Sequence, residues 1–218
     1  NTRLVGSEMC IRDRGYIDAI EGRTGIECFD YWIKDLGRDG YLHNHTRMWF
    51  ASIWIHTLRL PWQLGADIFL KHLIDGDPAS NTLSWRWVAG LHTKGKSYLA
   101  YPDNIKRFTN GKFYPHKQLA THVKSAKEED KPLPKQLNFE SKLRSGKKGF
   151  LVHESDLSPN FLNGYDMILI QGNPLKSTSR SSLVQSFISD ALKEYQKKFT
   201  KNQKCDIALI DLEDPKID

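Results

Sequence analysis

The sequence predicts a mainly α-helical protein followed by a small α/β segment. Residues 15–110 hold apolar side chains at helical spacing between capping and helix-breaking residues. Residues 149–218 hold short apolar runs typical of strands, with one amphipathic stretch between the last two. A polar, lysine-rich segment at 116–148 separates the two patterns and is interpreted as a basic linker.

The composition excludes several classes of protein. Of the 218 residues, 39% are hydrophobic and 27% are charged, which suffices for a packed core and is too apolar for a disordered chain. No stretch approaches the roughly 18 apolar residues that a membrane-spanning helix needs, so no membrane partner is expected. Three cysteines without regular spacing exclude a disulfide scaffold and a set of paired cysteine metal ligands.

Residues 1–14 are expected to be foreign to the natural protein. Residues 4–13 read LVGSEMCIRD, which resembles the translation of a transposon-end sequencing adaptor, and Arg14 follows. These residues are left out of the fold prediction, as a cloning scar would be. The natural chain is then expected to extend upstream of Gly15, so that the sequence is a fragment.

The first two helices are expected before residue 60. Thr24–Glu27 fits a capping box, in which the hydroxyl and the carboxylate each accept a backbone N–H of the first turn. The helix that follows should end at Gly37 to Gly40. The second helix should run from about His43 to Arg59, with Pro61 stopping it. It is apolar on most sides, which is typical of a buried central helix.

Two further helices complete this half of the chain. The third should run from about Gln63 to Ile74 and end at Asp75-Gly76. The fourth has Asp77 as its N-cap, with Pro78 at the first helical position, and ends before Gly90.

Strands and one helix are expected in residues 149–218. The apolar runs lie at Gly149–His153, Tyr165–Gln171 and Cys205–Leu212, and an amphipathic helix is expected from Ser182 to Phe199. This order of elements predicts half of a parallel α/β sheet, of unknown role. The apolar side of the helix is expected to consist of Leu183, Phe187, Ile188, Ala191, Leu192 and Tyr195.

Three motifs follow one another between Thr24 and Tyr98. They read TGIECFDYWIKDLGRDGYLHNHTRMWFASIW, then LIDGDPASNTLSWRWVAG, then TKGKSYL. In length and order they resemble the C-terminal, FAD-binding helical domain of the DNA photolyase and cryptochrome family. The resemblance covers about 75 residues, roughly a third of the chain. It implies a photolyase-type helical domain, here partial, at residues 15–115.

The residues themselves indicate a ligand. Asp77, Asn81 and Trp85 are spaced i, i+4 and i+8, so a helix places them on one face. A carboxylate, an amide and an indole in a row are unusual on a core helix. Buried polar groups need partners, and the carbonyls, nitrogens and ribose hydroxyls of a flavin supply them.

The resemblance implies a set of cofactor contacts. FAD would be held by Asn44, Arg47, Asp75, Gly76, Asp77 and Asn81. Asn81 would face N5 of the flavin, where an amide favours the reduced or semiquinone form by hydrogen bonding. The guanidinium of Arg47 would offset the negative charge on the reduced flavin. An antenna chromophore is not assigned.

The resemblance also implies roles in catalysis and in DNA contact. Trp85 would be the proximal tryptophan that passes an electron to the excited flavin, and Trp62 would be the middle member of that relay. Asn81 would contribute to catalysis by tuning the flavin. Trp87 resembles a tryptophan of the damage-binding wall, and Met48 a methionine that touches the damaged base pair. His45 stands at a DNA-contact position where family members often carry arginine, and this change weakens a phosphate contact.

Two features of the family are missing from the sequence. Its phosphate-binding cradle and its distal tryptophan would both lie upstream of Gly15. The chain is therefore expected to hold FAD weakly, because the adenine-diphosphate side of the pocket is largely upstream. His43 and His45 offer only two candidate metal ligands, and no metal is assigned.

Three functions remain open. The first is light-driven repair of pyrimidine dimers, a carbon–carbon lyase reaction with UV-damaged DNA as the partner of a cytoplasmic, bacterial-type protein. The second is a cryptochrome-like photoreceptor, or an FAD-binding module without repair. The third is a helical nucleic-acid-binding protein that uses the basic residues 116–149, which hold nine Lys/Arg against four Asp/Glu.

Overall fold

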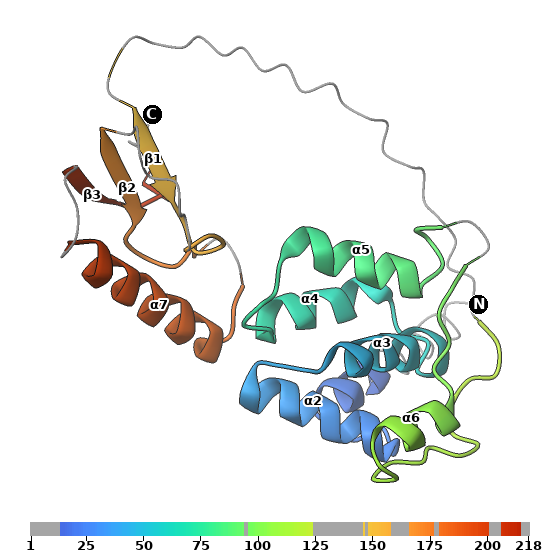
Figure 1. The fold of residues 1–218 in the computed structure, drawn as a ribbon. Helices are drawn as coiled ribbons and strands as arrows, with labels where there is room; N and C mark the ends of the chain where they lie inside the picture. Colours follow the sequence, from blue (N-terminus) through green and yellow to red (C-terminus); the bar gives the residue numbers. More distant parts are fainter. Residues whose placement is uncertain are drawn as a thin grey trace, which may run out of the picture. The chain divides into compact units, whose positions relative to one another are not determined.

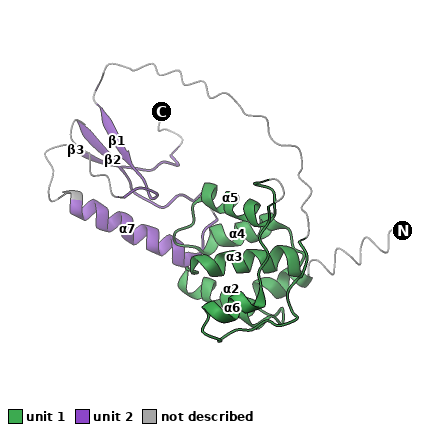
Figure 2. Ribbon diagram, turned by 45° about the vertical axis from the view of Figure 1, so that its right-hand side comes forward, with its two compact units in different colours: residues 1–129 green, residues 130–218 purple. Residues whose placement is uncertain are grey.

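The structure of the protein is a computed structural model. It describes residues 14–93, 96–123, 146, 148–157, 166–176, 179–200 and 206–214. The chain divides into two compact units, Asn1–Glu129 and Asp130–Asp218, and each is treated by itself (Figure 2). The adaptor-like residues 1–13 and most of the predicted linker 116–148 lie outside the described residues.

The first unit is helical, as the sequence predicts. Residues 14–20 form a first helix. The elements that follow are α2 (Glu27–Asp39), α3 (Asn44–Ser52), the π-helical turn η1 (Ile53–Thr57), α4 (Trp62–His72), α5 (Pro78–Val88) and α6 (Pro102–Phe108) (Figure 1). Within the unit, α3 lies between α2 and the α4–α5 pair.

The start of α2 differs from the predicted capping box. Ile26 is the N-cap and makes no side-chain capping bond. The carboxylate of Asp30, not Glu27, accepts hydrogen bonds from Thr24 N (2.9 Å), Thr24 Oγ1 (2.7 Å) and Gly25 N (3.0 Å). Thr24 lies outside α2. Gly25, in the left-handed conformation (φ 80°), turns the chain between Thr24 and the start of the helix. The hydroxyl and the carboxylate therefore meet directly.

The end of α2 is confirmed at one of the two predicted glycines. Gly40 adopts the left-handed conformation (φ 65°) and donates its N–H to Leu36 O at 3.0 Å. A side chain is strained in this conformation, so glycine is favoured at this C-cap. Gly37 lies within the helix.

The predicted central helix is present with an added π turn. His43 is its N-cap, and α3 passes into η1 without a break. Leu58 N bonds Ile53 O at 2.9 Å, which is the i→i+5 pattern of a π turn. The chain then leaves the helix at Arg59 (φ 60°), two residues before the predicted stop at Pro61.

The α4–α5 hairpin follows the local rules that the sequence shows. Asp77 is the N-cap of α5, and its Oδ1 accepts from Ser80 N at 2.7 Å. Pro78 occupies the first helical position, and Gly90 (φ 77°) follows the end of α5. These predictions are confirmed.

Helix α6 was not predicted. It has seven residues, and among them only Ile105 is buried. One buried side chain gives no apolar periodicity to detect, although Tyr101-Pro102 is a possible start signal.

Large aromatic side chains form the centre of the first unit. Phe29 stacks on Phe50 with ring centroids 4.4 Å apart. Trp85 meets Phe69 at 5.1 Å and Trp54 at 6.3 Å, both edge-to-face. All of these rings are at most 3% exposed. The core therefore joins α2, α3, η1, α4 and α5.

His56 lies within this core and makes stability depend on pH. Its ring is fully buried, and Nε2 lies 3.2 Å from Val88 O. Burial, and secondarily the charge of Arg59, lowers the pKa of His56 below its ordinary 6.5. Below pH 6.5 His56 therefore binds a proton more readily in the unfolded chain than in the folded chain. The contribution of neutral His56 to the free energy of unfolding is fully present above pH 6.5 and decreases as the pH falls below that value.

We expect His56→Gln to flatten this dependence. Urea unfolding at a series of pH values should show a smaller decrease in the free energy of unfolding below pH 6.5 than the wild type shows. His116→Gln, which removes an exposed imidazole, is the control. An unchanged slope in His56→Gln would contradict the prediction, whatever its absolute stability.

The second unit contains the predicted parallel sheet. The strands are β1 (Gly149–Val152), β2 (Met167–Gln171) and β3 (Asp206–Ile210), in the order β1-β2-β3 (Figure 1). Helix α7 (Ser182–Thr200) connects β2 to β3. A small core lies between helix and sheet, formed by Val152, Ile168, Ile170 and Tyr195 with neighbouring side chains.

The predicted apolar face of α7 is confirmed in part. Leu192 and Tyr195 are buried and Ile188 and Ala191 are half-buried, whereas Leu183 and Phe187 are 40% and 51% exposed. At the start of the helix the fully buried side chain is Val184, which lies in line with Ile188 and Leu192 at helical spacing. Leu183 and Val184 are both apolar, so the sequence alone does not select between them. No helix among the described residues is long and apolar enough to cross a membrane.

Candidate functional site

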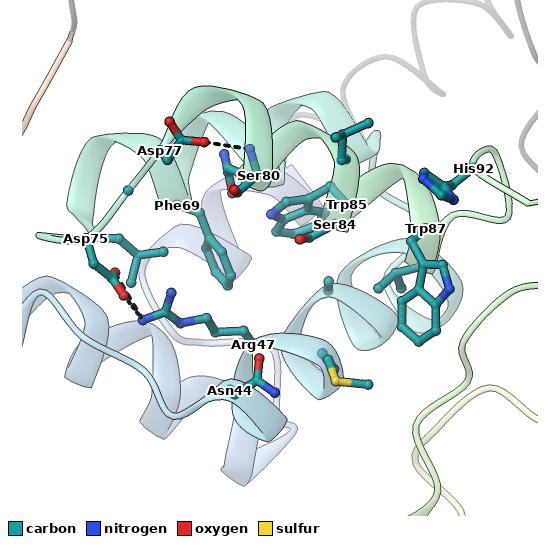
Figure 3. Close-up of a pocket in the computed structure, with 17 residues that line it drawn as sticks. Asn44, Arg47, Phe69, Asp75, Asp77, Ser80, Ser84, Trp85, Trp87 and His92 are labelled. Atoms are coloured by element: carbon teal, nitrogen blue, oxygen red, sulfur yellow. Dashed lines mark hydrogen bonds and ion pairs between the residues drawn. The ribbon is translucent and has the colours of Figure 1, made fainter. Parts of the chain in front are cut away.

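The first unit contains a pocket of about 470 Å³ (Figure 3). This volume lies within the roughly 300–1,000 Å³ range of small-molecule sites. Side chains of α3, α4 and α5, and of the turn between α4 and α5, form its wall. They are Asn44, Arg47, Met48, Ala51, Phe69, Leu73, Asp75, Gly76, Asp77, Ser80, Asn81, Leu83, Ser84, Trp85, Trp87, Val88 and His92.

Most of the residues singled out in the sequence come together here. The predicted residues in the wall are Asn44, Arg47, Met48, Asp75, Gly76, Asp77, Asn81, Trp85 and Trp87. They come from segments up to about 40 residues apart in the sequence. His45 and Trp62 are not in the wall. Asp77, Asn81 and Trp85 share one face of α5, as their spacing along a helix requires.

Arg47 and Asp75 form an ion pair at one end of the pocket. The guanidinium donates to both carboxylate oxygens, at 3.1 and 2.9 Å. Its Nε donates to Leu42 O at 2.7 Å, which fixes the direction of the side chain from α3. Figure 3 shows this pair beneath Asp77, at the end of the pocket away from Trp87. A partly buried cation held in this way can bind an anionic ligand group.

Asn81 is oriented by the neighbouring helix. Its Nδ2 donates to Ala66 O of α4 at 2.7 Å. Since a carbonyl oxygen accepts only from the NH₂ end of an amide, this bond fixes which end of the amide holds Oδ1, and that oxygen can accept from a ligand. The site therefore presents an acceptor at this point of the wall.

Trp85 is the most buried aromatic ring of the wall. It is 1% exposed, and its Nε1 has no hydrogen-bond partner among the described residues. A buried N–H without a partner is costly, so a ligand that accepts from it is favoured. Phe69 lies beside it in the wall, with ring centroids 5.1 Å apart.

The other end of the pocket carries Trp87 and His92. Trp87 points away from Trp85, as its helical angle predicts, and stacks on Tyr98 with centroids 5.5 Å apart. Figure 3 shows Trp87 and His92 close together at this end. The pocket thus joins a charged end to an aromatic end.

The two remaining predicted residues lie elsewhere on the first unit. His45 is exposed, and its ring meets Phe108 of α6 at 5.3 Å and Trp49 at 5.9 Å. Trp62 is half-buried at the start of α4, with the guanidinium of Arg86 5.9 Å from its ring centre.

Sequence reasoning missed several residues of the wall. Ser84 lies seven residues after Asp77, so extending the same helical spacing would have found it. Phe69 and His92 gave no such signal. Their places depend on how α4 and the segment after α5 pack against the rest of the unit.

Comparison with known proteins gives a family for the first unit. Residues 17–125 match the model of the FAD binding domain of DNA photolyase. Similar curated proteins carry the name deoxyribodipyrimidine photo-lyase. That of Streptomyces griseus is 44% identical over 72 residues, 33% of this chain and 16% of the relative. That of Alkalihalophilus pseudofirmus is 38% identical over 96 residues, 43% of this chain and 20% of the relative.

The match to these relatives is local. The protein of Escherichia coli is 37% identical over 78 residues, 36% of this chain and 16% of the relative. The chain thus spans between about a sixth and a fifth of the length of these relatives.

Proposed function

Because the chain belongs to the DNA photolyase and cryptochrome family, whose matched domain binds FAD, we propose that the pocket of α3, α4 and α5 is its FAD site and that it serves light-driven repair of pyrimidine dimers in DNA. The observation that supports this most is the pairing of Trp85 and Asn81 in one wall. A buried indole N–H without a partner and an oriented amide oxygen lie one helical turn apart.

The residues present fit a flavin. The ring system of FAD is planar and carries both acceptors and N–H donors, so the Nε1 of Trp85 and the Oδ1 of Asn81 can both find partners on it. Phe69 and Trp85 offer apolar surface for a planar ring. When bound, FAD supplies light absorption and one-electron transfer, the chemistry that splits a dimer.

The charged end of the pocket would hold and tune the cofactor. Arg47 places a positive charge there, and its pairing with Asp75 keeps the guanidinium in one position. This charge lowers the cost of negative charge on a bound ligand. Asn44, Gly76 and Asp77 complete the proposed contacts in the same part of the wall.

Trp85 is the proposed electron donor to a flavin bound in the pocket. Its ring is shielded from water by Phe50, Phe69 and other core side chains, which suits a group that reacts by electron transfer. Trp62 is the proposed second member of the electron-transfer relay. Asn81 is the proposed residue that favours the reduced cofactor.

A nucleic-acid partner is supported by the charge of the segment that follows Trp85. Residues 86–117 hold seven Lys/Arg against one Asp/Glu. Met48 and Trp87 line the pocket, where they would contact a base turned out of the duplex. His45 would contribute to the same DNA surface. Phosphate contacts would come from the basic side chains of this segment.

A photoreceptor without repair is the second candidate. The observation that favours it is His45, an exposed imidazole at a position where the family often has a guanidinium for phosphate contact. Blue-light treatment of a dimer-containing oligonucleotide with the FAD-loaded, reduced protein separates the two. Restored thymines support repair, and intact dimers beside a light-responsive flavin spectrum support the photoreceptor.

The FAD site itself is tested by titration with FAD, followed by flavin fluorescence and by the visible spectrum after desalting. We expect the wild type to bind, and Asn81→Ala to bind about three- to tenfold more weakly, because one oriented hydrogen bond to the cofactor is lost. Asn104→Ala, in α6 and outside the pocket wall, is the matched control and should bind as the wild type does. Absence of binding by the wild type, or equal binding by both variants, would contradict the site.

A further inference from the structure

Gly65 lies in the middle of α4 at a point where no side chain fits. A Cβ built on it would overlap Cη2 of Trp85 and lie 2.5 Å from Cζ3 of the same ring. Gly65 is itself buried, and its φ is outside the left-handed region. The close approach of the ring, rather than the backbone conformation, therefore requires glycine here.

The ring of Trp85 has no room to move away. It is 1% exposed and packs against Phe69 and Trp54, with centroids 5.1 and 6.3 Å away. Side chains packed at interior density accept an added methyl group only by shifting backbone or leaving their rotamers. An added Cβ at residue 65 must therefore displace the indole, or α5 with it.

The next residue of α4 makes a second contact of the same kind. Ala66 O accepts the amide of Asn81, one turn before Trp85 on α5. Two consecutive residues of α4 thus meet two α5 residues of the pocket wall. A contact at each of two neighbouring points fixes both the distance and the rotation of α5 on α4.

We infer that Gly65 is a positioning residue for the pocket: its missing side chain lets the indole of Trp85 lie directly on the α4 backbone, and this sets how α5 presents Trp85 and Asn81 to the cofactor. The effect on FAD rests on the proposed function. The effect on the packing of Trp85 does not.

The test compares Gly65→Ala with Gly37→Ala. Both change a glycine inside a helix to alanine, but a Cβ at Gly37 meets nothing within 4 Å. Gly37→Ala should raise the melting temperature slightly, because alanine is favoured over glycine inside a helix, and should keep the near-UV circular dichroism and the FAD affinity of the wild type. Gly65→Ala should lower the melting temperature by at least about 5 °C, reduce the near-UV tryptophan signal of the FAD-free protein, and weaken FAD binding by at least about tenfold.

A second substitution separates positioning from a general loss of stability. Phenylalanine lacks the outer indole atoms that the new Cβ meets, so Gly65→Ala/Trp85→Phe should regain much of the melting temperature that Gly65→Ala loses. It should also bind FAD as Trp85→Phe alone does. If Gly65→Ala does not fold but the double variant does, the inference stands.

Two results would overturn the inference. One is a Gly65→Ala protein with the wild-type near-UV signal and FAD affinity. The other is a double variant no more stable than Gly65→Ala. If the wild type binds no FAD, the proposed function fails, while the near-UV signal and the rescue by Trp85→Phe still decide the role of Gly65.

Discussion

Replacement of Arg47 by alanine is expected to weaken FAD binding about thirtyfold or more. A hydrogen bond from a charged group contributes about 1.5–3 kcal/mol, and each 1.4 kcal/mol is a factor of ten in affinity. Here the loss has two parts. The cofactor loses a cation, and the carboxylate of Asp75 keeps its charge at the same end of the pocket without its partner.

Matched variants identify the cause of the loss. Arg38→Ala removes the same charge from α2, where Arg38 pairs with Asp35 and Asp39 and lines no part of the pocket. It should bind FAD as the wild type does. Arg47→Lys keeps the charge but loses the two-pronged contact with Asp75, so its affinity should be intermediate. FAD titration followed by flavin fluorescence measures all three.

A second outcome would show that the charge pair is only structural. If Arg47→Ala and Arg38→Ala bind FAD equally well, Arg47 does not contribute to the cofactor site. Asp75→Asn gives an independent check, because it removes the negative charge and leaves Arg47. This variant should lose much less affinity than Arg47→Ala.

Replacement of Trp85 by alanine is expected to lower the free energy of unfolding of the first unit by about 3–5 kcal/mol. This is the usual cost of removing a fully buried large aromatic side chain, because the apolar surface is lost and a cavity remains. Trp85 is 1% exposed and touches rings from three other elements, which limits collapse around the cavity. The pocket would also lose part of its wall.

Urea unfolding followed by tryptophan fluorescence measures this effect. All six tryptophans of the chain lie in the first unit, so the signal reports that unit alone. Trp87→Ala makes the same chemical change two residues along α5, at a half-buried ring that stacks on Tyr98. It should cost less than half as much. Equal decreases in the free energy of unfolding in the two variants would contradict the prediction that the burial of Trp85 stabilises the first unit.

Local chemistry predicted the parts of the fold that depend on neighbouring residues. Asp77 and Pro78 begin α5, and Gly40 ends α2, because capping needs only the residues at the helix end. The common face of Asp77, Asn81 and Trp85 follows from 3.6 residues per turn. These predictions hold wherever the helix packs.

Predictions that depend on a partner surface were incomplete or wrong. The capping box at Thr24 is half right: the hydroxyl accepts the backbone N–H of Ile26 at 3.2 Å, but the carboxylate is that of Asp30 and not that of Glu27. The apolar side of α7 is right at Leu192 and Tyr195 but wrong at Leu183 and Phe187, since only packing against the sheet decides which of two adjacent apolar side chains is covered. The π turn after Ser52 has no sequence signal that a regular helix lacks.

The sequence by itself therefore determined the helical unit, the α/β unit and the ordered polar face of α5, because spacing along one helix is a property of the chain alone. Only the tertiary structure decided which residues share a pocket. Arg47 and Asp75 are 28 residues apart, and Gly65 and Trp85 belong to different helices. Their contacts exist because α3, α4 and α5 pack around common aromatic rings, and that packing follows from the shape and burial of many side chains at once.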